Sequence, residues 1–177
     1  DYDQDVFEQI RTEFIEFAMD EAAAGVFEKM LKGLGFSRAG LHKSKAVTRW
    51  RQGDVNIVVN CETEGFAHSF YITHGPSVCA IALRVEDAAA TTDRALKLLD
   101  PPFRQSVAPG ELDIPAVRGV GGSLIYFIDR KTDLGHLWDV DFDPVEEAPA
   151  SDAGLIAIDH LSQSMFYEEM LTWLLFY

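Results

Sequence analysis

The sequence has little cysteine, little positive charge and no long apolar run, and each shortage excludes a class of protein. Only two of its 177 residues are cysteine, which excludes a disulfide-rich secreted scaffold. Lysine and arginine number 15 against 29 acids, for a formal net charge of −14. Nucleic acids and anionic membranes bind clustered basic side chains, so we expect neither as a partner. No apolar stretch reaches the roughly 20 residues of a membrane span.

Both cysteines, Cys61 and Cys79, lie in apolar strand-like runs. This placement is typical of buried free thiols in a cytosolic protein, and nothing in the spacing supports a disulfide or a zinc site. Residues 1–5 are acidic and polar, unlike a signal peptide. We therefore expect a cytoplasmic protein.

What is present is the composition of a packed domain, 47% hydrophobic and 11% aromatic. Alternating and helical apolar patterns predict a strand, a helix capped by Asp20 and three further strands. The expected ranges are 13–19 (strand), 21–33 (helix), 36–42, 46–51 and 55–60 (strands). Residues 62–76 read as a polar loop.

The same order recurs after that loop, about 65 residues later, which indicates a duplicated βαβββ module. Pro101-Pro102 should break the chain after the second helix. The expected ranges are 77–85 (strand), 88–99 (helix), 103–107, 112–117 and 124–129 (strands). The predicted fold is therefore α+β, with tandem modules, mixed curved sheets and helices outside.

A third copy of the module begins after this, with only its first strand and helix. Residues 130–153 read as a connecting stretch with one short strand over 137–142, and the pattern restarts with a strand at 155–161 and a helix at 165–177. That helix is so apolar that it needs a covering sheet, which predicts that the sequence is part of a larger protein. The predicted organisation is an extension (1–12), a domain (13–143, with modules 13–61 and 77–129), a linker (144–153) and the opening of a second domain (154–177).

Several stretches in this order resemble the vicinal-oxygen-chelate (glyoxalase-like) superfamily, and within it bacterial 4-hydroxyphenylpyruvate dioxygenase. They are Phe14–Ala18, His42–Lys45, Arg51–Asn56, His74–Cys79, Ile114–Val117, Asp139–Phe142 and Ile158–Leu161. The resemblance implies a metal-free first domain and a second domain that holds Fe(II) in a two-histidine, one-carboxylate triad. It implies that His160 is the first metal ligand, that the other ligands lie beyond Tyr177, and that residues 1–153 need no cofactor.

Three further stretches, 110–115, 123–127 and 171–177, resemble the dioxygenase-like C-terminal half of bifunctional bacterial 3-dehydroshikimate dehydratases. In such proteins a separate barrel with a divalent metal converts dehydroshikimate to protocatechuate, so this region would be structural and inactive alone. The alternative is a true dioxygenase that converts an aromatic 2-oxo acid and O2 to homogentisate. The expected partner is the rest of its own chain; a homo-oligomer stays open.

Aligning the three module openings places Phe14, Ala80 and His160 in equivalent positions. Tyr126 stands where the family's glutamate ligand would be. The two complete modules therefore lack metal ligands where the family needs them, and the sequence predicts no catalytic residue in them. For His160 itself, the competing interpretation is a histidine hydrogen-bonded in a core.

Glu16 is the other candidate, because it shares a strand face with Phe14 and Ala18 and would have a raised pKa if buried. A single acid in a strand is more often exposed to solvent or paired with a basic side chain, here Arg49 or Arg51. This is the competing interpretation of Glu16. No histidine pair has ligand spacing. A calcium loop at 139–150 is excluded because Pro144 and Ala150 replace the required glycine and glutamate. The glycines of 119–122 do not form a phosphate loop, because a strand follows them.

Overall fold

The first unit folds largely as the sequence predicts. The computed structural model describes residues 11–98, 103–149 and 151–177, so most of the predicted extension lies outside it. Asp20 caps the helix, since its carboxylate accepts a 2.8 Å hydrogen bond from the Ala23 amide. Gly53, at φ 56°, makes the tight turn between the last two strands. The elements are β1 (Arg11–Ala18), α2 (Glu21–Gly33), β2 (Ser37–His42), β3 (Val47–Gln52) and β4 (Val55–Asn60).

The second unit keeps its first strand, its helix and its last strand, but its return strands are reduced. The strand predicted over 103–107 is wrong, since Phe103 makes only an isolated bridge to Ala116. The strand predicted over 112–117 shrinks to three residues, because Pro115 has no amide hydrogen to extend the ladder. The predicted break at Pro101-Pro102 lies outside the described residues. The elements are β5 (Ser77–Arg84), α4 (Ala88–Leu96), β6 (Ala116–Arg118), a 3₁₀ turn (Val120–Gly122) and β7 (Leu124–Ile128).

The segment after β7 also differs from the expectation of a strand over 137–142. Thr132 caps a 3₁₀ turn (Asp133–His136), which runs into α5 (Leu137–Val140) before β8 (Phe142–Pro144). The Trp138 indole N–H donates to the Glu13 carboxylate of β1 over 2.9 Å, a tertiary contact that draws this turn against the sheet. β8 then pairs with β2.

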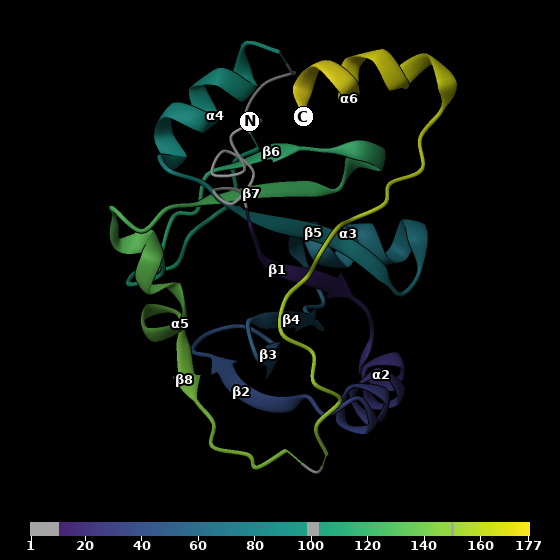
Figure 1. The fold of residues 1–177 in the computed structure, drawn as a ribbon, viewed down its shortest axis with the longest axis vertical. Helices are drawn as coiled ribbons and strands as arrows, with labels where there is room; N and C mark the ends of the chain where they lie inside the picture. Colours follow the sequence, from purple (N-terminus) through teal and green to yellow (C-terminus); the bar gives the residue numbers. More distant parts are fainter. Residues whose placement is uncertain (1–10, 99–102, 150) are drawn as a thin grey trace, which may run out of the picture.

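The eight strands of the described residues form one mixed sheet in the order β6-β7-β5-β1-β4-β3-β2-β8 (Figure 1). Within each unit the first strand runs parallel to the last, β1 to β4 and β5 to β7. The two units meet where β1 and β5 pair antiparallel. The predicted α+β class with tandem modules and outer helices is confirmed. No helix in the described part of the chain is both long and apolar enough to cross a bilayer.

The β1–β5 register makes the two units symmetric. Ile15 lies opposite Ile81, Phe14 opposite Ala82 and Glu16 opposite Ala80. A two-fold axis at Ile15 and Ile81 therefore exchanges Phe14 with Ala80. The register confirms that these two residues occupy equivalent places, as the repeat predicts.

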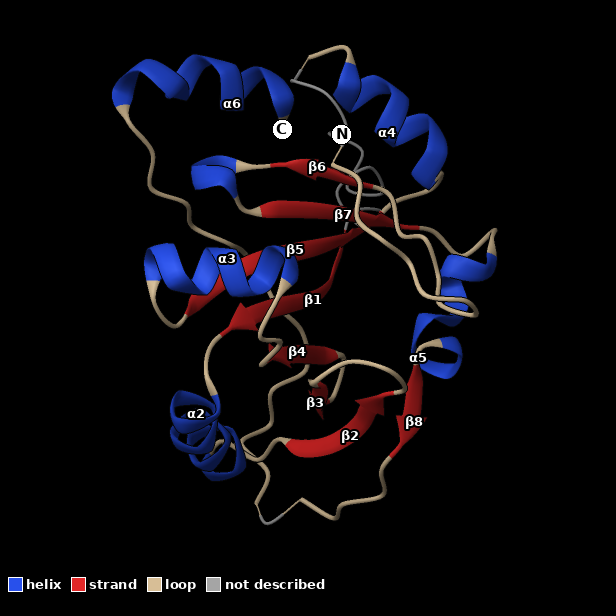
Figure 2. Ribbon diagram, turned by 180° about the vertical axis from the view of Figure 1, so that it is seen from behind, coloured by secondary structure: helices blue, strands red, loops and turns tan. Residues whose placement is uncertain are grey.

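The two faces of the sheet pack against different helices. One face packs its apolar side chains, among them Trp50, Ile57 and Ile125, against α2 and α4. The other face carries Phe14, Val58 and further residues of the largest core cluster. A helix between β4 and β5, α3 (Gly65–His74), lies over this second face (Figure 2).

Helix α3 replaces the polar loop predicted over 62–76. Its Phe66 and Phe70, four residues apart, both pack against the core cluster. The helix lacks the capping signal that marks α2 and α4, because Glu64 at its N-cap makes no side-chain hydrogen bond. Gly75, at φ 72°, ends it. Packing rather than local sequence accounts for this helix.

The segment predicted as a strand over 155–161 is extended but belongs to no strand. It runs along the face opposite α3 to the C-terminal helix (Figure 1). A strand needs a hydrogen-bonded partner, and within the described residues the backbone of this segment hydrogen-bonds only to the β3–β4 hairpin, while Ile158 packs against the cluster beneath α2. At the hairpin, the Leu155 amide donates to Gln52 over 3.1 Å and the Asp54 amide donates to the Ile156 carbonyl over 3.0 Å. The helix predicted over 165–177 is shorter: a 3₁₀ turn (Tyr167–Glu169) leads into α6 (Met170–Phe176).

Gln52 fastens this C-terminal segment to the first unit. Its side chain, only 9% exposed, also donates to the Leu34 carbonyl over 3.0 Å. We expect Gln52→Ala to lower the free energy of unfolding by about 1–2 kcal/mol, because the Leu34 carbonyl and the Leu155 amide lose a partner. Hydrogen exchange at the Leu155 amide should accelerate. Arg51→Ala, in the same strand but with an exposed side chain, is the control; unchanged exchange at Leu155 in Gln52→Ala would contradict this role.

Candidate functional site

The face of the sheet beneath α3 contains a cavity of about 970 Å³. Its floor consists of side chains from β1, β3, β4 and β7, and its walls come from α3, from 103–114 and from α5. The floor side chains are Phe14, Glu16, Val47, Val58, Asn60 and Tyr126.

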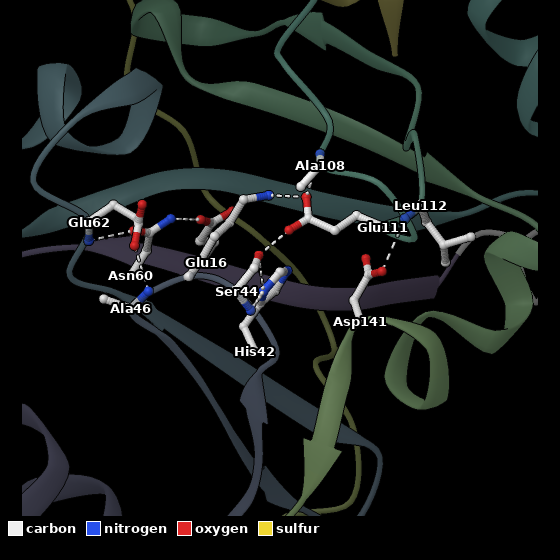
Figure 3. A network of polar contacts seen from close by, with 11 residues as sticks. Glu16, His42, Ser44, Ala46, Asn60, Glu62, Ala108, Glu111, Leu112 and Asp141 are labelled. Atoms are coloured by element: carbon white, nitrogen blue, oxygen red, sulfur yellow. Dashed lines mark hydrogen bonds and ion pairs between the residues drawn. The ribbon is translucent and has the colours of Figure 1, made fainter.

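Glu16 is the carboxylate on this floor. The Asn60 side-chain amide donates to its Oε1 over 2.7 Å, and Asn60 in turn accepts a 2.9 Å hydrogen bond from the Glu62 amide (Figure 3). Burial raises the pKa of the Glu16 carboxyl, and the Asn60 hydrogen bond and the charge of Lys45 oppose this without cancelling it. Burial, and next the negative charge of Glu16, raise the pKa of Tyr126 well above its usual value.

This geometry confirms that Phe14, Glu16 and Ala18 share a face, since Phe14 and Ala18 belong to the core cluster beside the cavity. It excludes the competing interpretation of Glu16 as an exposed or arginine-paired acid. Arg49 donates to Asn56 instead, and Arg51 donates to the Gly53 carbonyl.

A second polar group, around Glu111, closes one side of the cavity. Its carboxylate accepts hydrogen bonds from the Ser44 hydroxyl, from Lys45 Nζ at 2.7 Å and from the Ala108 amide at 3.2 Å. Ser44 donates its amide to His42 Nδ1 over 3.2 Å, so that nitrogen is an acceptor (Figure 3). Burial opposes ionisation of Glu111, but these donors together lower its pKa to about 2. The Lys45 charge is therefore matched by a carboxylate that stays ionised.

The sequence did not indicate Lys45, Asn60 or Glu111 as members of the site. Asn60 could have been found, because it lies two residues from Val58 on the same face of a predicted strand. Glu111 gives no such signal, since it belongs to an irregular segment.

His160 lies away from this cavity, in the extended C-terminal segment. Its side chain is 81% exposed, and Nδ1 lies 2.8 Å from Asp159 Oδ2. The competing interpretation, a histidine hydrogen-bonded in a core, does not describe this exposed position. No group of three or more His, Cys, Asp or Glu side chains with metal-binding geometry occurs among residues 11–98, 103–149 and 151–177. A lone imidazole does not supply the three donors of the iron triad, so the donors in this segment do not by themselves fit the metal.

In the two complete units, the positions equivalent to the family's metal-ligand positions are occupied by Phe14, Ala80 and Tyr126. Phe14 and Ala80 face the same side of β1 and β5, and Tyr126 lies opposite Ala82 on β7. Neither a benzyl group nor a methyl group donates to a metal. Cys61 and Cys79 are free thiols; Cys79 is buried as predicted, whereas Cys61 is only half-buried, and burial raises the pKa of both.

A family model described as the N-terminal part of hydroxyphenylpyruvate dioxygenase matches residues 7–143. The chain belongs to this family. The match spans both modules and reaches into β8, so the resemblance of the motifs within residues 7–143 is confirmed, whereas Ile158–Leu161 lies beyond it.

Known members of two kinds are similar to this chain. A 3-dehydroshikimate dehydratase of Pseudomonas putida is 47% identical over 93% of this chain, which spans 26% of that protein. A 4-hydroxyphenylpyruvate dioxygenase of Pseudomonas sp. strain P.J. 874 is 38% identical over 93% of this chain, which spans 46% of it.

A solved structure described as a "xylose isomerase-like TIM barrel/4-hydroxyphenylpyruvate dioxygenase fusion protein" superimposes with a TM-score of 0.82 at 46% identity. It matches 94% of this chain, which spans 26% of that protein. This chain thus corresponds to a quarter of the dehydratase and fusion proteins and to about half of the dioxygenase.

Proposed function

We propose that this chain is the dioxygenase-like region of a bifunctional 3-dehydroshikimate dehydratase, a cytoplasmic enzyme. Residues 13–143 form a metal-free structural domain, residues 144–153 a linker, and residues 154–177 the opening of a second domain. One observation carries the proposal: identity is 47% to a dehydratase but 38% to a dioxygenase, each over 93% of the chain. The 46% identity to the barrel fusion supports it.

The exposed apolar side chains of the C-terminal segment support a partner within the same protein. Leu171, Leu174 and Leu175 of α6 are each 66–68% exposed. Leaving such a cluster in water is costly, and the remainder of a second domain would cover it. This region would then be inactive alone and would position other domains.

The second candidate is the first domain of a true Fe(II)-dependent 4-hydroxyphenylpyruvate dioxygenase, which the family match to residues 7–143 favours. Assays of the complete protein separate the two functions. We expect it to convert 3-dehydroshikimate to protocatechuate. Formation of homogentisate from 4-hydroxyphenylpyruvate, Fe(II) and O2, without dehydration of dehydroshikimate, would establish the dioxygenase instead.

His160 has the same role under either function: in the complete protein it would supply one imidazole to a divalent metal, Fe(II) in a true dioxygenase. We expect His160→Ala to lower the metal content of the dioxygenase-like half, measured by elemental analysis. His136→Ala, a histidine that is also exposed at 70%, is the matched control and should keep the metal. Equal metal content in the two variants would show that His160 is not a ligand.

A further inference from the structure

The cavity beside Glu16 has no part in the proposed function, yet it has the properties of a small-molecule site. Its volume of about 970 Å³ lies in the range of known ligand pockets. Phe66, Phe70 and Trp138 line it and are only partly buried, so their rings border the empty space rather than fill it. A domain that served packing alone would gain stability by closing this space.

The aromatic side chains of the lining form two groups, one that joins Phe14 of the floor to α5 and one on α3 and the segment after α4. Phe14 lies edge-on to Trp138, with ring centroids 5.7 Å apart and planes at 69°. In the second group, Phe66 lies edge-on to Phe103 at 5.2 Å, and 5.8 Å from Phe70. Tilted rings present both faces and edges, which suits a planar aromatic guest.

The polar end of the cavity has a specific vacant hydrogen-bonding position. The Asn60 side-chain amide donates to Glu16 Oε1. Glu16 Oε2 accepts no hydrogen bond from a side chain or backbone amide of the described residues. A ligand hydroxyl donates to Oε2 when the carboxyl is ionised and accepts from it when it is protonated. A hydroxyl is therefore satisfied in both states of Glu16.

A ligand carboxylate is disfavoured at this end of the cavity. It would meet the Glu16 oxygens, and Lys45 cannot offset it freely because Glu111 holds the lysine at 2.7 Å. A neutral hydroxyl avoids this cost.

We propose that this cavity binds a small, hydroxylated aromatic molecule, with the ring among the aromatic side chains of Phe14, Trp138, Phe66 and Phe70 and a hydroxyl on Glu16. The probe is catechol, added to the complete protein with methyl-labelled valine. We expect chemical-shift changes at Val47 and Val58, which line the floor. These shifts locate the ligand here and not in another domain, whether or not the protein dehydrates 3-dehydroshikimate.

Variants and analogues test the chemistry. Glu16→Leu should weaken catechol binding by about tenfold, the effect of one lost hydrogen bond. Ser69→Trp, at an exposed position on the α3 rim, should block the cavity without disturbing the core. Glu86→Gln, a surface glutamate outside the cavity, should bind as the parent does. Benzoate and 1,2-cyclohexanediol, which lack the hydroxyl or the aromatic ring, should each bind about tenfold more weakly than catechol.

Thermal unfolding of each variant verifies the fold, and Ser69→Trp keeps the test informative if Glu16→Leu does not fold. Absence of shifts at Val47 and Val58 with catechol at millimolar concentration would overturn the proposal. So would shifts that persist in Ser69→Trp, or benzoate binding as tightly as catechol.

Discussion

Replacing Glu13 with alanine is expected to lower the free energy of unfolding by about 3 kcal/mol, the cost of removing one partner from a buried ion pair. Glu13 is 7% exposed and lies on β1. Its carboxylate accepts hydrogen bonds from the Arg84 guanidinium of β5 and from the Trp138 indole of α5. Three segments, one from each unit and one from beyond them, thus meet on a single side chain.

Alanine would leave the Arg84 guanidinium, whose side chain is 29% exposed, without its counter-charge, and the indole N–H without an acceptor. Chemical denaturation of the parent and the variant measures the loss. Glu86→Ala is the matched control: this glutamate also bonds a cation, Lys131, but its side chain is 75% exposed. It should cost less than about 1 kcal/mol. Similar losses in the two variants would show that the Glu13 pair does not join the units.

Local signals in the sequence predicted the elements that carry their own start and stop residues. Asp20 caps α2 in the structure as the sequence predicts, and Asp87 caps α4 in the same way, since each accepts a hydrogen bond from an amide three residues on. Helix α3 carries no such cap, and its Phe66 and Phe70 are held by the core cluster. A reading based on caps and polarity therefore misses it.

In the candidate site, too, local sequence predicts one part of the arrangement and not the other. The period of two along β1 sufficed to place Glu16 beside Phe14 on one face. Its partner Asn60 is 44 residues away in the chain, and Lys45 and Glu111 are separated by 66. Contacts of that range depend on the strand order and on the path of an irregular segment. Spacing can place Asn60 on the face of Val58, but neither the strand order nor this path follows from spacing, so the contacts of the polar network became visible only in the fold.

Lowering the pH from about 5 to about 2 is expected to remove about 2–3 kcal/mol of stability through Glu111 alone. Its folded pKa of about 2 lies below the ordinary glutamate pKa of 4.5. A depressed carboxyl pKa stabilises the fold above the unfolded value, and this contribution is lost as the pH falls through the folded value. Glu111→Gln should therefore be less stable than the parent near neutral pH.

The measurement is the free energy of unfolding of the parent and of Glu111→Gln over this pH range. Other acids, Asp129 among them, also have lowered pKa values, so absolute acid denaturation does not isolate Glu111. The difference between the two proteins does, and it should shrink steadily as the pH falls. Glu86→Gln should instead differ little from the parent throughout, because its side chain is largely exposed. A parent-to-Glu111→Gln difference that stays constant with pH would mean that Lys45 and Ser44 do not hold the ionised carboxylate in the folded state.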